Sequence, residues 1–238
     1  MLYIIGLGLN VDGISKYGLE TVKKCKRVYL ENYTVEFPYS QNELKDVLGK
    51  KIIPADRKFV ENLSIIDEAK KIDVALLVYG NPLTATTHIT LIDEAKKSKV
   101  RHKIIYSASI LDALGETGLQ IYKFGKITSM PKWDEKKKFT PDSFAKIIKE
   151  NQSIKAHSLI LIDIGLEFTD ALEQLKTASK NNKVNLKKIL ICSRLGTKHR
   201  KILYKDINEL ENYQIKSPYC MIIPSELHFV EKEFLENL

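Results

Sequence analysis

Short segments of small and polar residues follow several apolar runs, and these are the places where the sequence could do chemistry. The first is Gly6-Leu7-Gly8-Leu9-Asn10, at the end of the opening apolar run. Glycine after a strand lets the backbone approach a ligand closely. A dinucleotide-binding fingerprint would need a third glycine where Val11 stands, and no helix begins directly there. The segment is therefore either a turn after a strand that binds a ligand other than a dinucleotide, or a tight turn that binds no ligand.

The second segment, Gly80-Asn81-Pro82-Leu83-Thr84-Ala85-Thr86-Thr87-His88, is rich in hydroxyl groups and follows a strongly apolar run. Open parallel sheets bind ligands beyond the carboxyl ends of their strands, which favours a binding loop. A strand-to-helix turn capped by Thr86 or Thr87 explains the same residues. Both interpretations stay open, and His88 is more typical of a structural residue at a helix start than of a ligand.

Two further segments also follow apolar runs, Ser107-Ala108-Ser109-Ile110 and Ile162-Asp163-Ile164-Gly165. A carboxylate at Asp163 suits either a general base or a turn cap. The cap is favoured, and no catalytic base is named by the sequence.

The sequence has no HExxH, CxxC, GxSxG or P-loop motif, and its five histidines are scattered. A reaction that needs neither a metal nor a covalent nucleophile therefore fits best. Methyl transfer from a sulfonium is such a reaction, because the donor carries its own activated leaving group and the protein mainly supplies alignment. An acceptor amine has only to be neutral, and burial lowers the pKa of an amine.

The elements that must position these segments alternate between strands and helices in the first half of the chain. This pattern predicts a mostly parallel sheet with helices on both faces. The predicted strands are Leu2–Leu9, Arg27–Glu31, Lys51–Pro54, Val74–Tyr79 and Lys103–Tyr106, and the predicted helices are Ser15–Lys24, Asn42–Leu48, Phe59–Lys71 and Thr87–Lys97.

The second half is richer in strands, so we place a domain boundary after residue 108. This gives an N-terminal α/β domain over residues 1–108 and a C-terminal α/β domain over residues 109–238, which we expect to pack closely around a cleft. The predicted strands are Gly125–Met130, Ser158–Ile164, Lys188–Ser193, Lys201–Tyr204 and Tyr219–Ile223. The predicted helices are Ser109–Leu114, Pro141–Asn151, Leu172–Ser179, Asp206–Tyr213 and Glu226–Leu238, and Met130–Thr140 is predicted to be a loop.

The composition limits the partners of the chain. The net charge is +8, but only five of the 38 basic residues are arginine and the lysines are spread along the chain. This favours a solvated lysine-rich surface over a nucleic-acid site, and leaves an acidic partner open. The three cysteines, Cys25, Cys192 and Cys220, are expected to be small buried hydrophobic residues. No apolar run approaches the roughly 20 residues needed to span a bilayer, so we expect a cytoplasmic protein without membrane contact.

Several segments together resemble the diphthine synthase family, in order and spacing along essentially the whole chain. The matching segments are Tyr3-Ile4-Ile5-Gly6-Leu7-Gly8-Leu9, Gly80–His88, Ser109-Ile110, Thr117-Gly118-Leu119-Gln120-Ile121-Tyr122-Lys123-Phe124-Gly125 and Leu161-Ile162-Asp163-Ile164.

The resemblance implies a fold and an activity. The fold is two α/β domains of the tetrapyrrole-methylase type with the cofactor cleft between them, assembled as a homodimer. The implied cofactor is S-adenosyl-L-methionine, which becomes S-adenosyl-L-homocysteine. The implied reaction methylates the amino group of the 3-amino-3-carboxypropyl-histidine of translation elongation factor 2 to give diphthine, a step of diphthamide biosynthesis. Direct binding of nucleic acid is not expected.

The family's cofactor contacts match eight positions: Leu9, Asn81, Thr84, Ser109, Ile110, Ile162, Leu195 and Tyr219. Relatives often have aspartate where this chain has Asn81, which matters only if the contact is made by the side chain. Pro224-Ser225-Glu226-Leu227-His228 also replaces a Pro-Gly-Lys-Leu-His pattern. Two alternatives share this fold: a methylase acting on a corrin ring or on ribosomal RNA, and a non-catalytic nucleotide-binding protein.

Overall fold

The computed structural model describes all residues from 1 to 238 and divides them into two compact units, Met1–Ala113 and Leu114–Leu238. The sequence places the boundary after residue 108, whereas the structure keeps the short helix α6 (Ile110–Ala113) with unit 1. Ser109 is tied to this helix because its backbone N–H donates to the Asp112 carboxylate at 2.6 Å. None of the helices combines the length and the apolar character required to cross a membrane.

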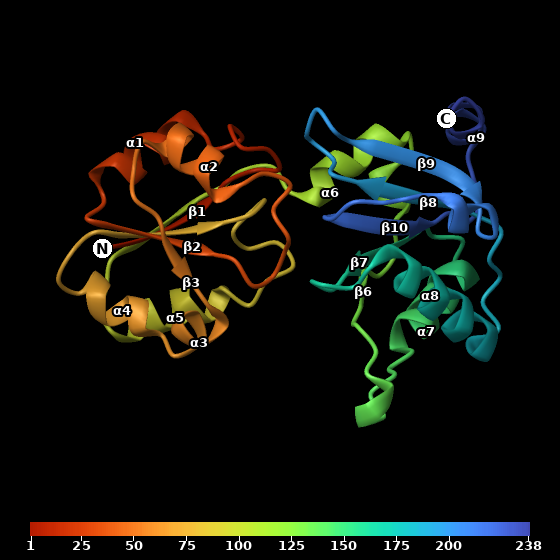
Figure 1. Cartoon of the computed structure of the whole chain (residues 1–238), viewed down its shortest axis with the longest axis horizontal. Coiled ribbons are helices and arrows are strands. Elements are labelled where there is room, and N and C mark those ends of the chain that lie inside the picture. The colour runs from red at the N-terminus through yellow and green to blue at the C-terminus, as the bar shows by residue number, and fades with distance from the viewer. The chain divides into compact units, whose positions relative to one another are not determined.

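Unit 1 is built on one parallel sheet of five strands in the order β3-β2-β4-β1-β5 (Figure 1). The strands are β1 (Leu2–Gly6), β2 (Arg27–Glu31), β3 (Ile53–Ala55), β4 (Val74–Val78) and β5 (His102–Ile105). The mostly parallel sheet expected from the sequence is therefore present.

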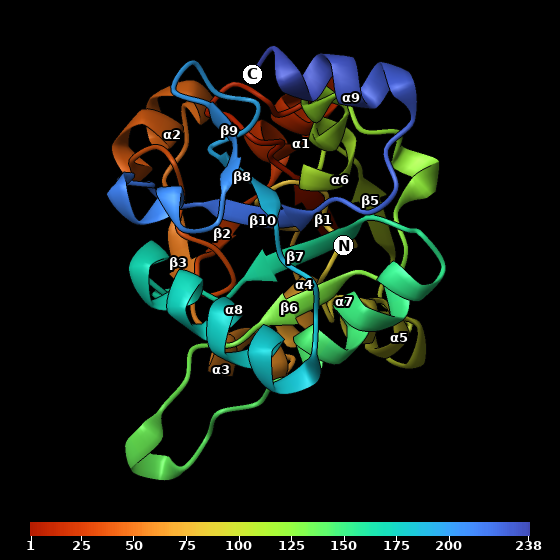
Figure 2. The ribbon, with the colours of Figure 1, turned by 90° about the vertical axis from the view of Figure 1, so that its right-hand side faces the viewer.

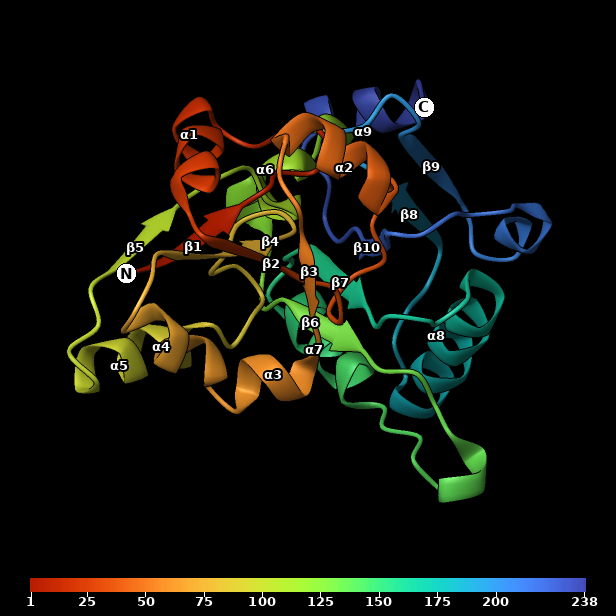
Figure 3. The same ribbon diagram turned by 60° about the vertical axis from the view of Figure 1, so that its left-hand side comes forward.

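Helices cover both faces of this sheet (Figures 1 and 3). They are α1 (Lys16–Lys24), α2 (Gln41–Leu48), α3 (Arg57–Glu61), α4 (Ser64–Ala69) and α5 (Ile89–Lys97). The central strand β4 is buried along its whole length, with Val74, Leu76 and Val78 in the core under α3–α5 and Ala75 and Leu77 in the core under α1 and α2. A strand buried on both faces has to be continuously apolar, which explains the composition of this run.

The order of the strands creates a switch point between β1 and β4, which are neighbours in the sheet. The chain leaves β1 toward α1 on one face, and it leaves β4 toward α5 on the other face. The two loops therefore diverge at the carboxyl ends of adjacent strands, the place where open α/β sheets bind ligands.

Local signals define most helix starts in unit 1. The Ser15 hydroxyl accepts from Gly18 N at the start of α1, and Ser40 and Glu43 form a capping box at the start of α2. The single helix predicted over Phe59–Lys71 is wrong, because the structure breaks it into α3 and α4. Leu63 at the break has a left-handed backbone with φ of 61°, which no sequence pattern indicated.

Unit 2 is built on a mixed sheet in the order β6-β7-β10-β8-β9, in which only β6 and β7 are parallel (Figures 1 and 2). The strands are β6 (Thr128–Met130), β7 (Ser158–Ile162), β8 (Lys188–Ser193), β9 (Lys201–Asp206) and β10 (Tyr219–Ile223). Helices α7 (Ser143–Ser153) and α8 (Phe168–Asn182) cover one face, and α9 (Phe229–Glu236) lies on the other side of the sheet.

Two predicted elements of unit 2 differ in the structure. The helix predicted over Asp206–Tyr213 is wrong: β9 continues to Asp206, and only a short 3-10 turn, η4 (Glu209–Asn212), follows. The strand predicted over Gly125–Met130 shortens to β6. Gly125 lies close to Asn151, because a Cβ added at Gly125 would sit 2.2 Å from the Asn151 Oδ1 atom.

A buried carboxylate, Glu231, anchors α9 to the rest of unit 2. It accepts the Gln120 N–H at 2.9 Å, the His228 N–H at 2.7 Å and the Lys123 ammonium at 2.5 Å. The His157 Nδ1 atom accepts the Ser225 N–H at 3.0 Å, so Nε2 carries the proton that faces Glu231 at 3.2 Å. Burial raises the pKa of Glu231, but these hydrogen bonds outweigh burial and lower the pKa to about 2.

Replacing Glu231 by glutamine should therefore lower the free energy of unfolding by about 3 kcal/mol, because the half-buried Lys123 ammonium loses its charge partner at a buried position. Since the folded-state pKa lies below the ordinary value of 4.5, the advantage of the wild-type chain should be complete above about pH 4.5 and fade toward about pH 2. Urea unfolding at several pH values measures this. Glu233→Gln, an exposed position on the same helix, is the control and should change stability by less than about 0.5 kcal/mol.

Candidate functional site

The ends of β1 and β4 are joined by backbone contacts at three glycines. Gly8 and Gly80 exchange hydrogen bonds, Gly8 N to Gly80 O at 3.2 Å and Gly80 N to Gly8 O at 2.9 Å. Both have a left-handed backbone, with φ of 73° and 70°. A Cβ at Gly6 would stand 2.6 Å from the Gly80 carbonyl oxygen, closer than such atoms can approach. The two loops are thus fixed to each other directly above the switch point.

The loop after β4 is shaped by the Asn81 side chain. Its Oδ1 atom accepts the Leu83 N–H at 3.0 Å, and its Nδ2 atom donates to the Ser107 carbonyl at 3.3 Å. An aspartate could keep the first bond but not donate the second. The side chain is thus engaged within unit 1, and Thr84 follows in the same turn through its N–H to the Asn81 carbonyl at 3.2 Å.

Ser107, at the exit of β5, links all three loops of this edge. Its carbonyl accepts from Asn81, and its hydroxyl donates to the Gly13 carbonyl of the β1 loop at 2.8 Å. The sequence placed Ser107 in a candidate segment but not among the cofactor contacts. Its only signal was a serine directly after a strand, which does not distinguish a linking residue from an ordinary turn.

Ser109 and Ile110 follow Ser107 and start α6. The Ser109 N–H and hydroxyl both donate to Asp112 Oδ2, at 2.6 and 2.9 Å. These hydrogen bonds, the backbone one first, hold the pKa of Asp112 below its ordinary value. The charged Asp112 carboxylate, which accepts two hydrogen bonds from Ser109, therefore fixes the position of this residue. Ser109 is buried where the chain leaves β5.

His88 holds the β4 loop from inside unit 1. Its Nδ1 atom lies 3.1 Å from the Pro82 carbonyl, which requires a proton on that nitrogen, and Nε2 lies 4.0 Å from the buried Glu31 carboxylate. Glu31 in turn accepts the N–H groups of Tyr33 and Thr34. His88 stands at the N-cap of α5, as a structural residue would, and its side chain supports the carbonyl between Asn81 and Thr84.

Leu9 completes the group in unit 1. The Tyr79 hydroxyl donates to the Leu9 carbonyl at 3.0 Å. This hydrogen bond joins the loop after β1 to the first residue after β4. The structure thus brings five predicted site residues together at one sheet edge: Leu9, Asn81, Thr84, Ser109 and Ile110. Their side chains are uncharged, some apolar and some polar, a mixture suited to a nucleoside-like ligand.

The other three predicted site residues, Ile162, Leu195 and Tyr219, lie at one edge of the unit 2 sheet. Ile162 ends β7, Leu195 follows β8 and Tyr219 begins β10. The antiparallel register brings these ends together, because Tyr219 pairs with Ser193 and Cys220 pairs with Leu161.

Hydrogen bonds hold this edge of unit 2 in place. The Tyr219 hydroxyl donates to the Leu166 carbonyl at 2.9 Å, and Arg194 N donates to the Pro218 carbonyl at 2.8 Å. Asp163, beside Ile162, accepts the Ile164 N–H at 3.0 Å, which is the turn-capping role favoured from the sequence.

The three cysteines are structural residues. All three are buried, as the sequence predicted. Burial raises the pKa of Cys25 to about 11, and the pKa of Cys192 is raised by its contact with Cys220 and by burial. Thiols in this state are poor nucleophiles at neutral pH.

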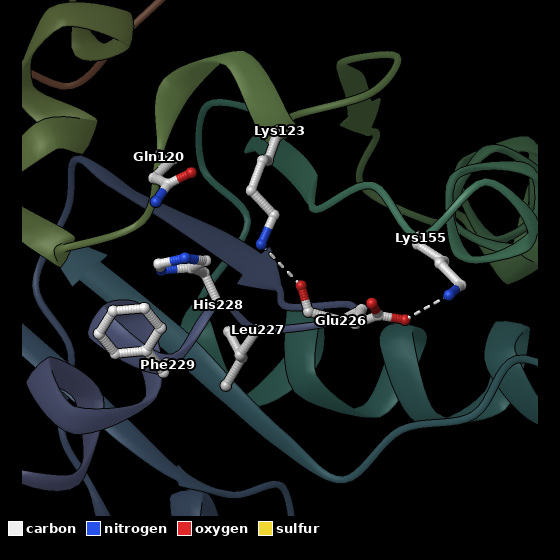
Figure 4. A pocket seen from close by; sticks show the side chains of 7 residues that line it. All are labelled: Gln120, Lys123, Lys155, Glu226, Leu227, His228 and Phe229. Atoms are coloured by element: carbon white, nitrogen blue, oxygen red, sulfur yellow. Dashed lines mark hydrogen bonds and ion pairs between the residues drawn. The ribbon is translucent and has the colours of Figure 1, made fainter.

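Unit 2 also contains a pocket of about 350 Å³ at the opposite end of its sheet (Figure 4). Ile223 and Ser158, which are paired, mark that end, whereas Tyr219 and Ile162 mark the other. Lys123 in this pocket donates to the Glu226 carbonyl at 2.8 Å, and Lys155 pairs with the Glu226 carboxylate at 2.7 Å (Figure 4). Its charged groups are neutralised within the chain, and it is separate from the predicted cofactor contacts of unit 2.

Comparison with known proteins gives the family. The model of the tetrapyrrole (corrin/porphyrin) methylases matches residues 1–211. Diphthine synthase of Methanocaldococcus jannaschii is 37% identical over 100% of this chain and 98% of its own length. Diphthine methyl ester synthase of Schizosaccharomyces pombe is 34% identical over 99% of this chain and 93% of its own length. A crystal structure of a diphthine synthase superposes with a TM-score of 0.90 at 31% identity, covering 99% of this chain and 94% of that one.

The chain therefore belongs to the tetrapyrrole methylase family and, within it, to the diphthine synthases. It is a methyltransferase of diphthamide biosynthesis that uses a methyl-donor cofactor.

Replacing Gly6 by alanine should force the β1 and β4 loops apart, because the new methyl group would overlap the Gly80 carbonyl. We expect the affinity for the methyl-donor cofactor to fall at least about tenfold, since both loops carry predicted contacts. Gly115→Ala is the matched control, because nothing lies within 4 Å of a Cβ there. Isothermal titration of both variants measures the effect, and equal affinities would show that the loop contact does not shape the site.

Proposed function

We propose that the methyl donor is S-adenosyl-L-methionine and that Leu9, Asn81, Thr84, Ser109, Ile110, Ile162, Leu195 and Tyr219 contact it. The observation that carries this proposal is the switch point of unit 1, where two glycine-joined loops present uncharged residues beyond the strand ends. The cofactor supplies a methyl group on a sulfonium that is already a good leaving group. The chain's task is then alignment rather than chemical activation.

We further propose that the acceptor is the amino group of the 3-amino-3-carboxypropyl-histidine of translation elongation factor 2, and that the product is diphthine. The names of the full-length relatives support this substrate. We also propose that the reaction takes place in the cytoplasm, where the elongation factor works, and that the chain forms a homodimer, as the family resemblance implies.

In this proposal the residues of unit 1 act by fixing the positions of the three loops that contact the cofactor. Tyr79 fixes the Leu9 carbonyl, and His88 fixes the Pro82 carbonyl between Asn81 and Thr84. Ser107 holds the three loops at a constant separation. Positioning of this kind lowers the barrier because the reacting groups meet without further loss of orientational freedom.

The experiment is methyl transfer with purified components. The chain should bind S-adenosyl-L-methionine by isothermal titration and transfer labelled methyl groups to elongation factor 2 that carries the modified histidine. Factor with an unmodified histidine is the control and should accept none. Lack of cofactor binding would refute the whole proposal, and transfer to a corrin or to ribosomal RNA instead of the factor would refute the substrate.

The relatives' names divide between diphthine synthase and diphthine methyl ester synthase. Our proposal places the methyl groups on the amino nitrogen. Fragmentation of the modified peptide by mass spectrometry locates each methyl group, and a methyl ester on the carboxylate as the first product would contradict this assignment.

Replacing Thr84 by tryptophan should weaken cofactor binding at least about tenfold, because a bulky ring would fill the space beside the β4 loop. Thr87→Trp is the matched control. Thr87 has the same type and lies in the same segment, but it is exposed and is not among the predicted contacts. Isothermal titration compares the two, and unchanged affinity in Thr84→Trp would remove Thr84 from the site.

A further inference from the structure

The connection between β6 and α7 extends away from the body of unit 2 as an arm, which we define as residues 131–141 (Figures 2 and 3). It contains one 3-10 turn, η3 (Glu135–Lys137), and at its base Trp133 packs against the core of unit 2. None of the roles assigned so far uses the arm.

The arm is ordered by hydrogen bonds at its tip and at its base. At the tip, Asp134 and Phe139 exchange two backbone hydrogen bonds, both 2.9 Å long. At the base, the Trp133 indole N–H donates to the Pro141 carbonyl at 3.0 Å. The buried amide of Gln174 accepts from Trp133 N and donates to the Pro131 carbonyl, both at 3.0 Å. The buried Gln174 therefore holds the outgoing side of the base, and the Trp133 indole joins that side to the returning one at Pro141.

The surface that the arm presents is basic with one aromatic ring. Residues 135–140 are all exposed, and the Phe139 side chain is 52% exposed. Residues 132–138 contain four lysines and two acids, a net charge of +2. Lys137 pairs with Asp134 at 3.2 Å, while Lys136 and Lys138 form no ion pair within the chain. Phe139 thus follows directly on a run of three lysines, two of which have no ion-pair partner in the chain. Exposed aromatic side chains are enriched at protein interfaces, and free ammonium groups attract an acidic partner.

The base of the arm lies at the same sheet edge as the predicted contacts of unit 2. Met130, the last residue before the arm, pairs with Ile162 in the parallel register of β6 and β7. Lys132 donates through Nζ to the Gly165 carbonyl at 2.9 Å, and Asp163 N donates to the Met130 carbonyl at 3.1 Å. The arm and the Ile162 turn are therefore one connected structure.

We propose that the arm is a docking element for an acidic surface of the protein substrate. The proposal rests on the proposed function, because a methyltransferase whose acceptor is one side chain of a large protein has to engage surface beyond that side chain. Charge complementarity indicates an acidic partner, because the arm is basic. Its basic residues are lysines rather than arginines, and Phe139 is its one exposed aromatic side chain. Phosphate-backbone binding and base stacking favour arginine and several rings, so an acidic protein surface fits better than RNA.

The test is the double variant Lys136→Glu/Lys138→Glu. We expect its kcat/KM with purified, RNA-free modified elongation factor to fall at least about tenfold through KM, and its direct binding of that factor to weaken similarly. The difference from wild type should shrink as salt is raised, because the contacts are exposed. The affinity for S-adenosyl-L-methionine should not change. Phe139→Ser should also weaken binding, without altering the salt dependence.

The matched control is Lys149→Glu/Lys180→Glu, which makes the same charge change at exposed positions of α7 and α8. It should leave the binding of the factor close to wild type. Equal effects of the two double variants would show a general charge effect and overturn the proposal. So would unchanged binding in the arm variant, or a defect seen only when RNA is present. Direct binding is informative even without methyl transfer, so failure of the arm and failure of the proposed reaction are distinguishable.

Discussion

The structure of unit 1 depends on one close approach, that of the β1 and β4 exits at Gly6, Gly8 and Gly80. The chain leaves the adjacent parallel strands β1 and β4 toward opposite faces of the sheet, so the two loops diverge. The backbone N–H and C=O groups at the start of these loops then need hydrogen-bond partners outside the sheet. The glycines let the two backbones satisfy each other: a Cβ at Gly6 would stand 2.6 Å from the Gly80 carbonyl oxygen, and Gly8 and Gly80 adopt left-handed backbone angles that favour glycine. Tyr79, Ser107 and His88 extend this bond network to the surrounding loops. These hydrogen bonds join the loops of the edge, and none of its five predicted contacts carries a charge.

In unit 2, the strand register and buried hydrogen-bonding groups position the predicted contacts and the elements around the sheet. Its three predicted contacts come from strands of alternating direction, and the antiparallel register alone brings their ends to one edge. The buried Gln174 and Glu231 each fix an element that the sheet does not hold: Gln174 fixes the arm and Glu231 fixes α9. In unit 1, by contrast, hydrogen bonds from Tyr79, His88 and Ser107, which are not predicted contacts, hold the loops that carry the contacts.

The sequence predicted the regular parts of this structure well, because they follow from periodicity. The continuous apolar run of β4 required a strand buried on both faces, and the βα alternation required a parallel sheet. The sequence prediction failed at Leu63, where one left-handed backbone angle divides the predicted helix into two. It also failed at Asp206, where strand β9 continues through a polar residue predicted to begin a helix. It also could not show which polar groups link the loops. Ser107 and Glu31 look like ordinary residues in sequence, and their roles come from partners far along the chain. The eight site residues came from the family resemblance rather than from periodicity, and they stay predictions.

The most direct test of this account is a crystal structure of the chain with S-adenosyl-L-homocysteine. We predict that the ligand lies beyond the carboxyl ends of β1 and β4, in contact with Leu9, Asn81, Thr84, Ser109 and Ile110, and that Ile162, Leu195 and Tyr219 also contact it. We also predict that the Gly8–Gly80 hydrogen bonds and the Asn81–Ser107 bond are unchanged. A ligand bound elsewhere, or one whose binding breaks these bonds, would contradict the claim that this strand edge is a preformed cofactor site.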